Sequence, residues 1–199
     1  MKRLIVSVAA LFVFATSALA QVEDPSQINF LGTAVLTKDT TSGPNTYSST
    51  KSGGGIVGYS YQFNRWASAE GNYGYTRNNQ NYLGTNGQAS IRSDIHELTG
   101  SFVARIPAHL GRLRPYALAG AGALIFNPTD QNTFQGAARQ AKATFVYGGG
   151  ADINIVHNFG VRAEYRGFLF KAPDFNLSGL NLDKVTHVAQ PSAGFFVRF

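Results

Sequence analysis

The sequence predicts an all-β fold: an eight-stranded antiparallel up-and-down transmembrane β-barrel, preceded by a cleaved signal peptide. Three observations lead to this prediction. Apolar and polar residues alternate with a period of two in segments of about ten residues. Almost all charged residues of these segments fall on one face of the alternation. The connections between segments alternate between long and short.

The first twenty residues have the composition of a secretory signal peptide. Lys2 and Arg3 precede an apolar run, and small residues at positions 18 and 20 form a cleavage motif. We therefore expect cleavage between Ala20 and Gln21, which assigns 1–20 to the signal peptide and 21–199 to one barrel domain. A membrane anchor fits less well, because the run is short and no basic flank follows it.

The composition favours strands and excludes several kinds of chemistry. The chain has 22 glycines, 9 tyrosines and 15 phenylalanines, a β-rich composition. It has no cysteine, which excludes disulfides, thiol nucleophiles and thiolate metal sites. The net charge of +6 comes without a run of Lys or Arg, so nucleic acid is not an expected partner.

Eight segments carry the alternation, and in chain order they are 27–37, 57–63, 67–76, 97–106, 114–126, 147–155, 161–169 and 185–199. The last segment shows the clearest alternation. The first segment shows the weakest, because Phe30 and Leu36 are expected to face outward and the equally apolar Leu31 and Val35 then face the lumen. Segment 114–126 has large apolar residues on one face and alanines on the other.

Aromatic residues near the expected strand ends predict belts at the two membrane interfaces. The expected belt residues are Trp66, Tyr73, Tyr75, Tyr116, Phe126, Tyr147 and Phe170. The intrinsic β-propensity of Tyr and Phe is the alternative explanation.

Four acids and four bases share the face opposite the large aromatic residues of these segments. They are Glu70, Glu97, Arg105, Asp152, Arg162, Glu164, Arg166 and Arg198. A soluble barrel would place its charges outside. The lumen of an eight-stranded barrel is filled by side chains, where unpaired charges are costly. We therefore expect a structural charge network that plugs the lumen; a conduction path is the alternative.

The connections set the expected topology. Long polar connections cover 38–52, 78–89, 127–141 and 172–184, and short ones lie near 64–65, 107–112 and 157–159. In outer-membrane barrels the long loops face the cell exterior, so both termini are expected in the periplasm. Pro191 removes a ladder hydrogen bond, and we expect a bulge or irregular rim there. The glycines at 53–55 and 148–150 are expected to relieve strain at bends.

Phe195, Val197 and Phe199 alternate along the last segment and resemble the terminal strand that the barrel-assembly machinery recognises. With the signal peptide, the whole pattern resembles the OmpA-like and OmpX-like eight-stranded barrels of the outer-membrane β-barrel superfamily. The resemblance implies export through the periplasm to the outer membrane of a Gram-negative cell. It also implies outer-membrane lipids, lipopolysaccharide and the assembly machinery as partners, a monomeric state, and no catalytic residues.

No motif for catalysis, a cofactor or a metal is present. The glycine clusters lack the Lys and Ser/Thr of a phosphate loop, and His96, His109, His157 and His187 are dispersed. Ser101 is expected in the lumen without a histidine near it in sequence. We therefore predict a non-enzymatic envelope protein with a structural or surface-interaction role. The alternatives are a small-solute channel resembling OmpW and, third, a lipid-modifying enzyme.

Overall fold

The computed structural model describes residues 23–42, 45–84, 87–106, 111–129, 139–173 and 184–199. The described strands are β1 (Ser26–Thr37), β2 (Thr40–Ser42), β3 (Asn45–Ser49), β4 (Ser52–Gln62), β5 (Ala67–Gly84), β6 (Gly87–Arg105), β7 (Leu113–Pro128), β8 (Gln140–Val156), β9 (Phe159–Lys171) and β10 (Val185–Arg198). Within the described ranges, no helix is long and apolar enough to span a membrane.

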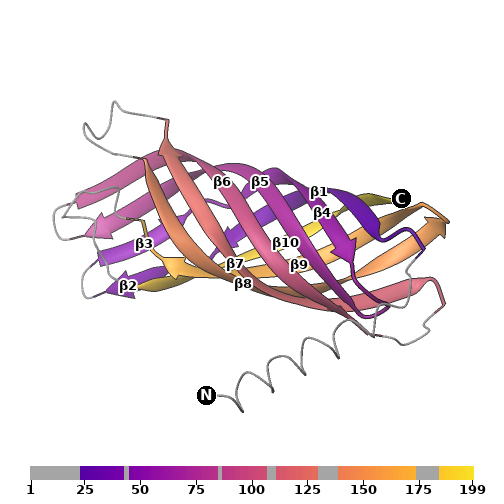
Figure 1. Cartoon of the computed structure of the whole chain (residues 1–199). Helices are drawn as coiled ribbons and strands as arrows, with labels where there is room; N and C mark the ends of the chain where they lie inside the picture. The colour runs from indigo at the N-terminus through magenta and orange to yellow at the C-terminus, as the bar shows by residue number, and fades with distance from the viewer. Residues whose placement is uncertain (1–22, 43–44, 85–86, 107–110, 130–138, 174–183) are drawn as a thin grey trace, which may run out of the picture.

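Eight of these strands form a closed antiparallel barrel (Figure 1). Each pairs with its neighbours in sequence, and β1 pairs with β10 to close the wall. The short strands β2 and β3 are additional and continue the sheet along β5, beyond the stretch that β5 shares with β4. The predicted fold class, an eight-stranded all-β barrel, is confirmed.

The two ends of the barrel differ. At one end the first and last strands are joined by two backbone hydrogen bonds, in which Ser26 and Phe199 each donate to the other, at 3.1 and 2.9 Å. We call this the terminal end, and the opposite end, which carries the long connections, the loop end. At the loop end β5 and β6 pair without interruption as far as Gly84 and Gly87. The segment 78–89, expected as a loop, is therefore mostly a projecting β-hairpin.

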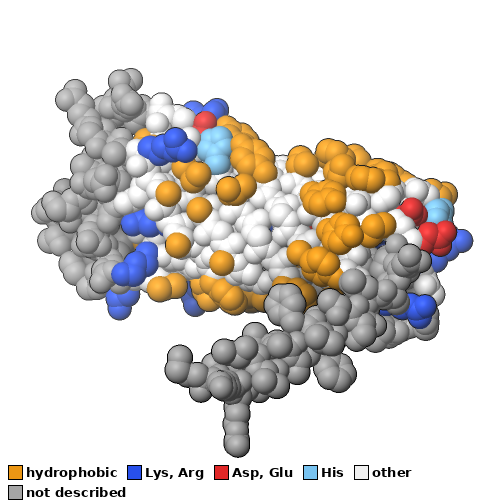
Figure 2. All heavy atoms as spheres, viewed as in Figure 1, with side chains coloured by type: hydrophobic (Ala, Val, Ile, Leu, Met, Phe, Trp, Pro, Cys, Tyr) orange, Lys and Arg blue, Asp and Glu red, His pale blue; other side chains and the backbone are white. Residues whose placement is uncertain are grey.

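The wall is apolar outside and polar inside. Large apolar side chains such as Trp66, Leu98 and Phe102 are more than half exposed on the outer face, whereas the eight charged residues predicted for the luminal face are buried. Figure 2 shows orange apolar side chains over the outer wall, with Lys and Arg gathered toward its two ends. This arrangement is the reverse of a soluble barrel and suits a hydrocarbon environment.

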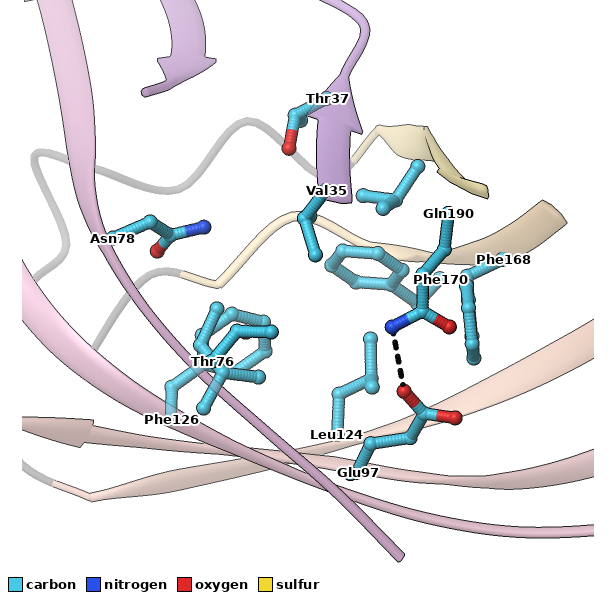
Figure 3. Close-up of a pocket in the computed structure, with 13 residues that line it drawn as sticks. Val35, Thr37, Thr76, Asn78, Glu97, Leu124, Phe126, Phe168, Phe170 and Gln190 are labelled. Atoms are coloured by element: carbon cyan, nitrogen blue, oxygen red, sulfur yellow. Dashed lines mark hydrogen bonds between the residues drawn. The ribbon is translucent and has the colours of Figure 1, made fainter. Parts of the chain in front are cut away.

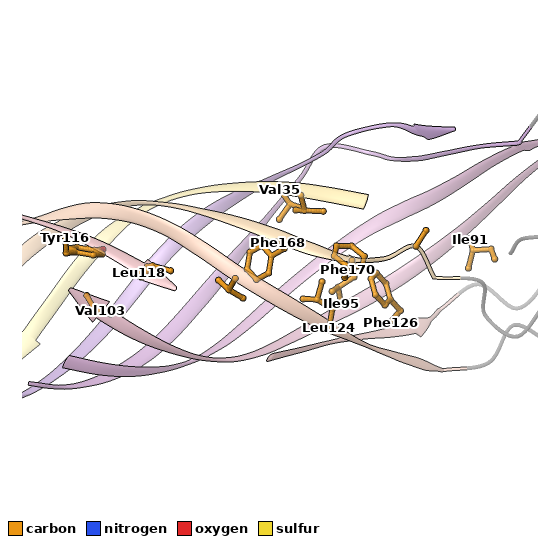
Figure 4. Packing of buried hydrophobic residues seen from close by; sticks show 13 residues of the cluster. Val35, Ile91, Ile95, Val103, Tyr116, Leu118, Leu124, Phe126, Phe168 and Phe170 are labelled. Atoms are coloured by element: carbon orange, nitrogen blue, oxygen red, sulfur yellow. The ribbon is translucent and has the colours of Figure 1, made fainter. Parts of the chain in front are cut away.

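Three residues of the expected aromatic belt lie in the lumen instead. Tyr116, Phe126 and Phe170 are 4%, 1% and 4% exposed, and Phe126 and Phe170 belong to a buried apolar cluster (Figure 4). On β7 the alanines face outward and the large side chains fill the interior. The belt assignment was wrong for these three because period-two alternation fixes the two faces but not which one is outside.

Of the two expectations at Pro191, a bulge or an irregular rim, only the bulge is absent. The β1–β10 register is unchanged from Gln27↔Arg198 to Thr37↔Val188, but the two pairs at Pro191 and Gln190 are missing from the ladder. Because proline has no N–H, the irregularity is a gap and not an inserted residue. The Pro191 carbonyl accepts a hydrogen bond from the Thr33 hydroxyl instead, at 3.1 Å. A register shift does occur between Asn154 and Val156, near the turn from β8 to β9.

Gly150 illustrates how closely the wall and the luminal side chains approach. A Cβ at this position would lie 2.4 Å from the Ala163 carbonyl oxygen and 2.7 Å from the Tyr116 hydroxyl oxygen. The glycine therefore leaves room for the Tyr116 ring to lie inside the barrel.

Candidate functional site in the barrel lumen

Arg162 is at the centre of the luminal charges. Its guanidinium donates two hydrogen bonds to Asp152, from Nε at 2.7 Å and from Nη2 at 3.1 Å. Its Nη1 donates to Glu70 at 2.7 Å. The same guanidinium lies 4.8 Å from the centre of the Tyr116 ring. The planar fork of arginine suits this bidentate geometry, which a lysine cannot reproduce.

Arg166, four residues further along β9 on the same face, joins the remaining acids. Its Nε donates to Glu164 at 2.5 Å and its Nη2 to Glu70 at 2.9 Å. Its Nη1 lies 3.5 Å from Glu97. Glu70 therefore bridges the two arginines from the opposite side of the lumen.

The network continues toward the terminal end through Asp152. Besides Arg162, this carboxylate lies 3.3 Å from Arg198 and 3.7 Å from Arg105. Arg198 also donates to Gln27 at 2.8 Å and to Asn154 at 3.0 Å. Arg105 donates to the Ser68 hydroxyl. Neutral side chains thus accept hydrogen bonds from guanidinium N–H groups that do not donate to an acid.

All eight predicted charged residues lie in this one network, and each is at most 6% exposed. They come from β5, β6, β8, β9 and β10, so the network crosses the lumen between opposite walls. Acids and bases alternate along it, and their formal charges cancel. We call these eight residues the ionic plug.

Neutral partners of the ionic plug were not predicted from the sequence. The Tyr116 hydroxyl donates to Glu164 at 2.6 Å, and the Asn72 side-chain amide donates to Glu70 at 3.1 Å. The Gln190 amide donates to Glu97 at 2.9 Å. For Asn72 and Gln190, the sequence did show a polar residue on the luminal face. For Tyr116, the one sequence feature that pointed to the lumen was Gly150, a luminal glycine on the neighbouring strand that leaves space for a ring.

A second feature missed by the sequence reading lies between the ionic plug and the loop end. Apolar side chains surround a narrow cavity there (Figures 3 and 4). We call it the luminal chamber; its apolar lining residues are Val35, Ile95, Leu124, Phe126, Phe168, Phe170 and Val188, and its polar ones are Thr37, Thr76, Asn78, Glu97 and Gln190. The Phe126 and Phe170 rings are 5.9 Å apart.

The histidines of the described ranges lie outside the lumen. On the outer wall, His96 Nδ1 is 2.8 Å from the Tyr73 hydroxyl and His187 Nε2 is 3.0 Å from the Tyr147 hydroxyl. His157 pairs with Asp24 near the terminal end, at 3.1 Å. Ser101 faces the lumen, away from the three described histidines. The described residues contain no group of three ligands for a metal; His109 lies outside them.

Two of the predicted assembly residues, Phe195 and Val197, share the outer face of β10, and Phe199 directly follows this strand. The ring of Phe195 lies 5.3 Å from Phe30 and 6.0 Å from Phe159, across both neighbouring strands. Phe195, Val197 and Phe199 are each more than a third exposed. The expected cleavage site at Ala20 and Gln21 falls outside the described residues.

Solved structures with the same fold are outer-membrane barrels. OprG of Pseudomonas aeruginosa matches with a TM-score of 0.60 and 14% identity, over 87% of this chain and 95% of that one. Neisserial surface protein A matches with 0.59 and 12% identity, over 88% and 97%. Ail, the attachment invasion locus protein of Yersinia pestis, matches with 0.54 and 21% identity, over 89% and 100%. At these identities the likeness concerns the fold alone.

Sequence comparison with curated proteins gives no match. A family model does match: the outer membrane protein beta-barrel domain, over residues 6–189. This range contains most of the barrel wall described above. The chain therefore belongs to the family of outer membrane protein β-barrel domains, whose place is the bacterial outer membrane.

Proposed function

We propose that this barrel is a non-enzymatic envelope protein with a sealed lumen, which serves the outer membrane as a structural element and presents its loop end for surface contacts. The observation that carries the proposal is the ionic plug. Arg162 and Arg166 bridge acids from β5, β6, β8 and β9, and all of these side chains are buried. Eight strands leave a lumen narrow enough for side chains to fill.

The proposal includes an orientation. The loop end faces the cell exterior, and the terminal end faces the periplasm, through which the chain reaches the membrane after losing residues 1–20. The projecting β5–β6 hairpin and the added strands β2 and β3 support this orientation, because long connections of outer-membrane barrels face outward. Asparagines such as Asn79 and Asn81, on β5 beyond the apolar wall, give the hairpin the polar character of an exposed element.

Conductance tests the sealed lumen. The protein, refolded in detergent and checked by the difference in gel mobility between heated and unheated samples, is inserted into a planar bilayer. We expect no single-channel steps above the empty bilayer. A double variant that replaces both Arg162 and Arg166 with alanine is the comparison, since four acids then lose their main partners and water is expected to enter. Regular conductance steps from the unaltered barrel would overturn the proposal.

A deletion strain tests the envelope role. Cells without the protein are expected to become more sensitive to detergent, and the unaltered gene is expected to restore resistance. Complementation by the Ser101→Ala variant, equally well, would support a role without catalysis by this serine. Failure of Ser101→Ala alone, with a normally folded barrel in the membrane, would favour an enzyme instead.

One observation favours a second candidate, a channel for a small apolar solute. More than half of the residues that line the luminal chamber are apolar, which a simple ionic plug does not require. Uptake of such a solute into vesicles that contain the barrel, but not into empty vesicles, would favour the channel.

A further inference from the structure

The outer wall carries a hollow that the sealed lumen does not explain. It lies over β4, β5 and β6 and has a volume of about 460 Å³, compared with about 30 Å³ in the luminal chamber. By the same measure one water needs at least about 10–15 Å³, so many water-sized groups fit. The outward-facing residues that line the hollow are Tyr59, Tyr61, Ala69, Gly71, Gly100 and Phe102. We call it the wall groove.

Two glycines form the floor of the wall groove. Gly71 of β5 pairs with Gly100 of β6, and a Cβ placed on either of them would meet nothing within 4 Å. Glu70 and Ser101 also border the groove, but their side chains are buried on the luminal side, so only their main chain can do so. The floor is therefore bare backbone, and it is open to the surroundings of the barrel.

Aromatic rings form the two sides of the groove. Tyr59 and Tyr61 stand on β4 and Phe102 stands on β6, and each is between 44% and 52% exposed. The Tyr59 and Ser26 hydroxyls are hydrogen-bonded at 3.0 Å, so the polar end of this ring has a partner and its face is left for apolar contact. The two sides are about 10 Å apart, which is two strand spacings. An alkyl chain between them contacts both sides and the floor.

The turn 63–66 joins β4 to β5 at the terminal end and places the groove in the membrane. The Asn64 side-chain oxygen accepts backbone hydrogen bonds from Trp66 and from the next residue, at 3.0 and 2.8 Å, which fixes this turn. Trp66 and Arg65 are exposed there, and an exposed Trp marks the headgroup level. Gly71 is about 17 Å further along a strand tilted by about 40°, or about 13 Å deep, within the nearer half of a ~30 Å hydrocarbon layer.

The surroundings of the barrel determine what covers the wall groove. The chain belongs to a family of outer-membrane barrels and the outer face of its wall is apolar, so membrane hydrocarbon lies against this face. Elsewhere on the wall a lipid chain meets side-chain tips and contacts the protein on one side. In the groove the same chain is surrounded on three sides, and the added dispersion contacts hold it longer. At the headgroup level, the guanidinium of Arg65 complements a phosphate.

We propose that the wall groove holds one acyl chain of a phospholipid from the leaflet at the terminal end, and that Arg65 contacts the phosphate of this lipid. The chain lies over Gly71 and Gly100, between Tyr59 and Phe102. The proposal does not depend on the sealed lumen, because the groove is on the opposite side of the wall. Conductance by the unaltered barrel would refute the sealed lumen and leave the lipid site unaffected.

Photo-crosslinking tests the site. The barrel is refolded into nanodiscs of phosphatidylglycerol in which a small fraction of the lipid carries a diazirine in the middle of one acyl chain. After irradiation, the labelled residues are mapped by mass spectrometry. We expect several-fold more label on Tyr59 and Phe102 than on Val161 and Tyr165, which are outward residues of β9.

Variants that fill the groove provide the comparison at the same residues. Gly100→Leu should reduce the label on Tyr59 and Phe102 to the level of β9, because its side chain takes the place of the lipid chain. Ala163→Leu adds a leucine to the outer face of β9 and should leave that label unchanged. Gel mobility shows whether each variant folds. If Gly100→Leu does not fold, Gly71→Leu fills the same floor from the neighbouring strand.

The contact with the phosphate has its own test. A diacylglycerol with the same labelled chain lacks the phosphate, so the unaltered barrel should take several-fold less label from it in the groove. In Arg65→Gln the phospholipid and the diacylglycerol should label the groove alike. Arg112→Gln removes an exposed arginine next to the start of β7 and should keep the difference between the two lipids.

Four outcomes would overturn the proposal. The first is label spread evenly over the outer wall, and the second is label on Tyr59 and Phe102 that Gly100→Leu does not reduce. The third is equal labelling of the unaltered barrel by the phospholipid and the diacylglycerol. The fourth is a dimer of the refolded barrel in analytical ultracentrifugation that Gly100→Leu dissociates, which would assign the groove to a second copy of this chain.

Discussion

Arg162 and Asp152 face each other across β9 and β8, and the guanidinium of one donates two hydrogen bonds to the carboxylate of the other, at 2.7 and 3.1 Å. Both side chains are fully buried. The relationship matters because Arg162 also contacts Glu70, so one residue holds charges from three strands together.

Removing this arginine should strongly destabilise the barrel. Arg162→Ala leaves Glu70 and Asp152 buried with one partner fewer each, and the loss of one member of a buried ion pair costs about 3–5 kcal/mol. Urea unfolding in lipid vesicles, followed by the fluorescence of Trp66, the only tryptophan of the chain, measures the change. Arg77→Ala, which removes an exposed pair with Asp94 on the outer wall, is the control and should shift the midpoint far less. Equal shifts would contradict a special role for the buried network.

The loss of stability caused by replacing a glycine of the wall with alanine should depend on the face of the wall that the glycine occupies. Gly150→Ala places a methyl group against the Ala163 carbonyl and the Tyr116 hydroxyl, and overpacking of this kind costs about 1–3 kcal/mol. Gly71→Ala is the matched control, because a Cβ there meets nothing within 4 Å. The same urea titration compares them. If Gly150→Ala left the stability measured by urea unchanged, Tyr116 would be able to move away without destabilising the barrel.

A pH dependence is expected at the loop end. Arg77 and Asp94 lie beyond Tyr75 and His96, on the outer wall, and hydrogen bonds from the Arg77 guanidinium lower the pKa of Asp94 from its usual 3.8. A lowered acid pKa stabilises the fold above the unfolded-state value, and this contribution is lost as the pH falls through the folded-state value. NMR titration of the Asp94 carboxyl should show a pKa that rises toward 3.8 in Arg77→Gln. The Lys51→Gln variant should leave that pKa unchanged.

Phe199 should matter for assembly more than for stability. It is 55% exposed on the outer face, and the bonds it forms with Ser26 are made by its backbone. Phe199→Ala should therefore refold in detergent with nearly unchanged stability but accumulate more slowly in the outer membrane of growing cells. Pulse-chase labelling with the gel-mobility assay measures this rate. Ile28→Ala, elsewhere on the outer wall, is the comparison; equal delays would argue against an assembly signal.

The protein purified from outer membranes should begin at Gln21. Intact-mass measurement should give the mass of residues 21–199, and Ala20→Arg should block cleavage because the processing site requires a small residue there. A mass that includes residues 1–20 in the unaltered protein would contradict the signal-peptide assignment.

The alternation of the sequence predicted most of the wall, because side chains of a strand point to its two faces in turn. It placed Leu31 and Val35 in the lumen and Tyr73 and Tyr147 outside, as the structure has them. It failed on β7, where both faces are apolar and only the neighbouring strands decide which one points inward. The hairpin beyond Asn78 was missed because its polar residues resemble a loop until their pairing with β6 is known.

The sequence predicted that paired charges fill the lumen, but it did not predict which residues contact one another. Equal numbers of acids and bases on one face indicated that they would pair, yet nothing in the sequence says that Glu70 lies between two arginines of β9. Such contacts depend on the register and tilt of strands that are far apart in the chain. The luminal chamber was missed for the same reason, since Phe126 and Phe170 meet across β8, from two strands that do not pair with each other.

The gap in the ladder at Pro191 has a mechanical consequence. A barrel is a rolled sheet, and the β1–β10 contact is where its two margins are fastened. In this contact, the two consecutive pairs at Pro191 and Gln190 are missing from the ladder. Gln190 and Val35, which lies opposite it on β1, also border the luminal chamber. Thermal fluctuations should therefore separate β1 from β10 at the gap before they separate any other pair of neighbouring strands over a similar length. Amide protons of β1 and β10 around the gap should exchange with deuterium sooner than those of the unbroken β9–β10 contact at the same depth in the membrane.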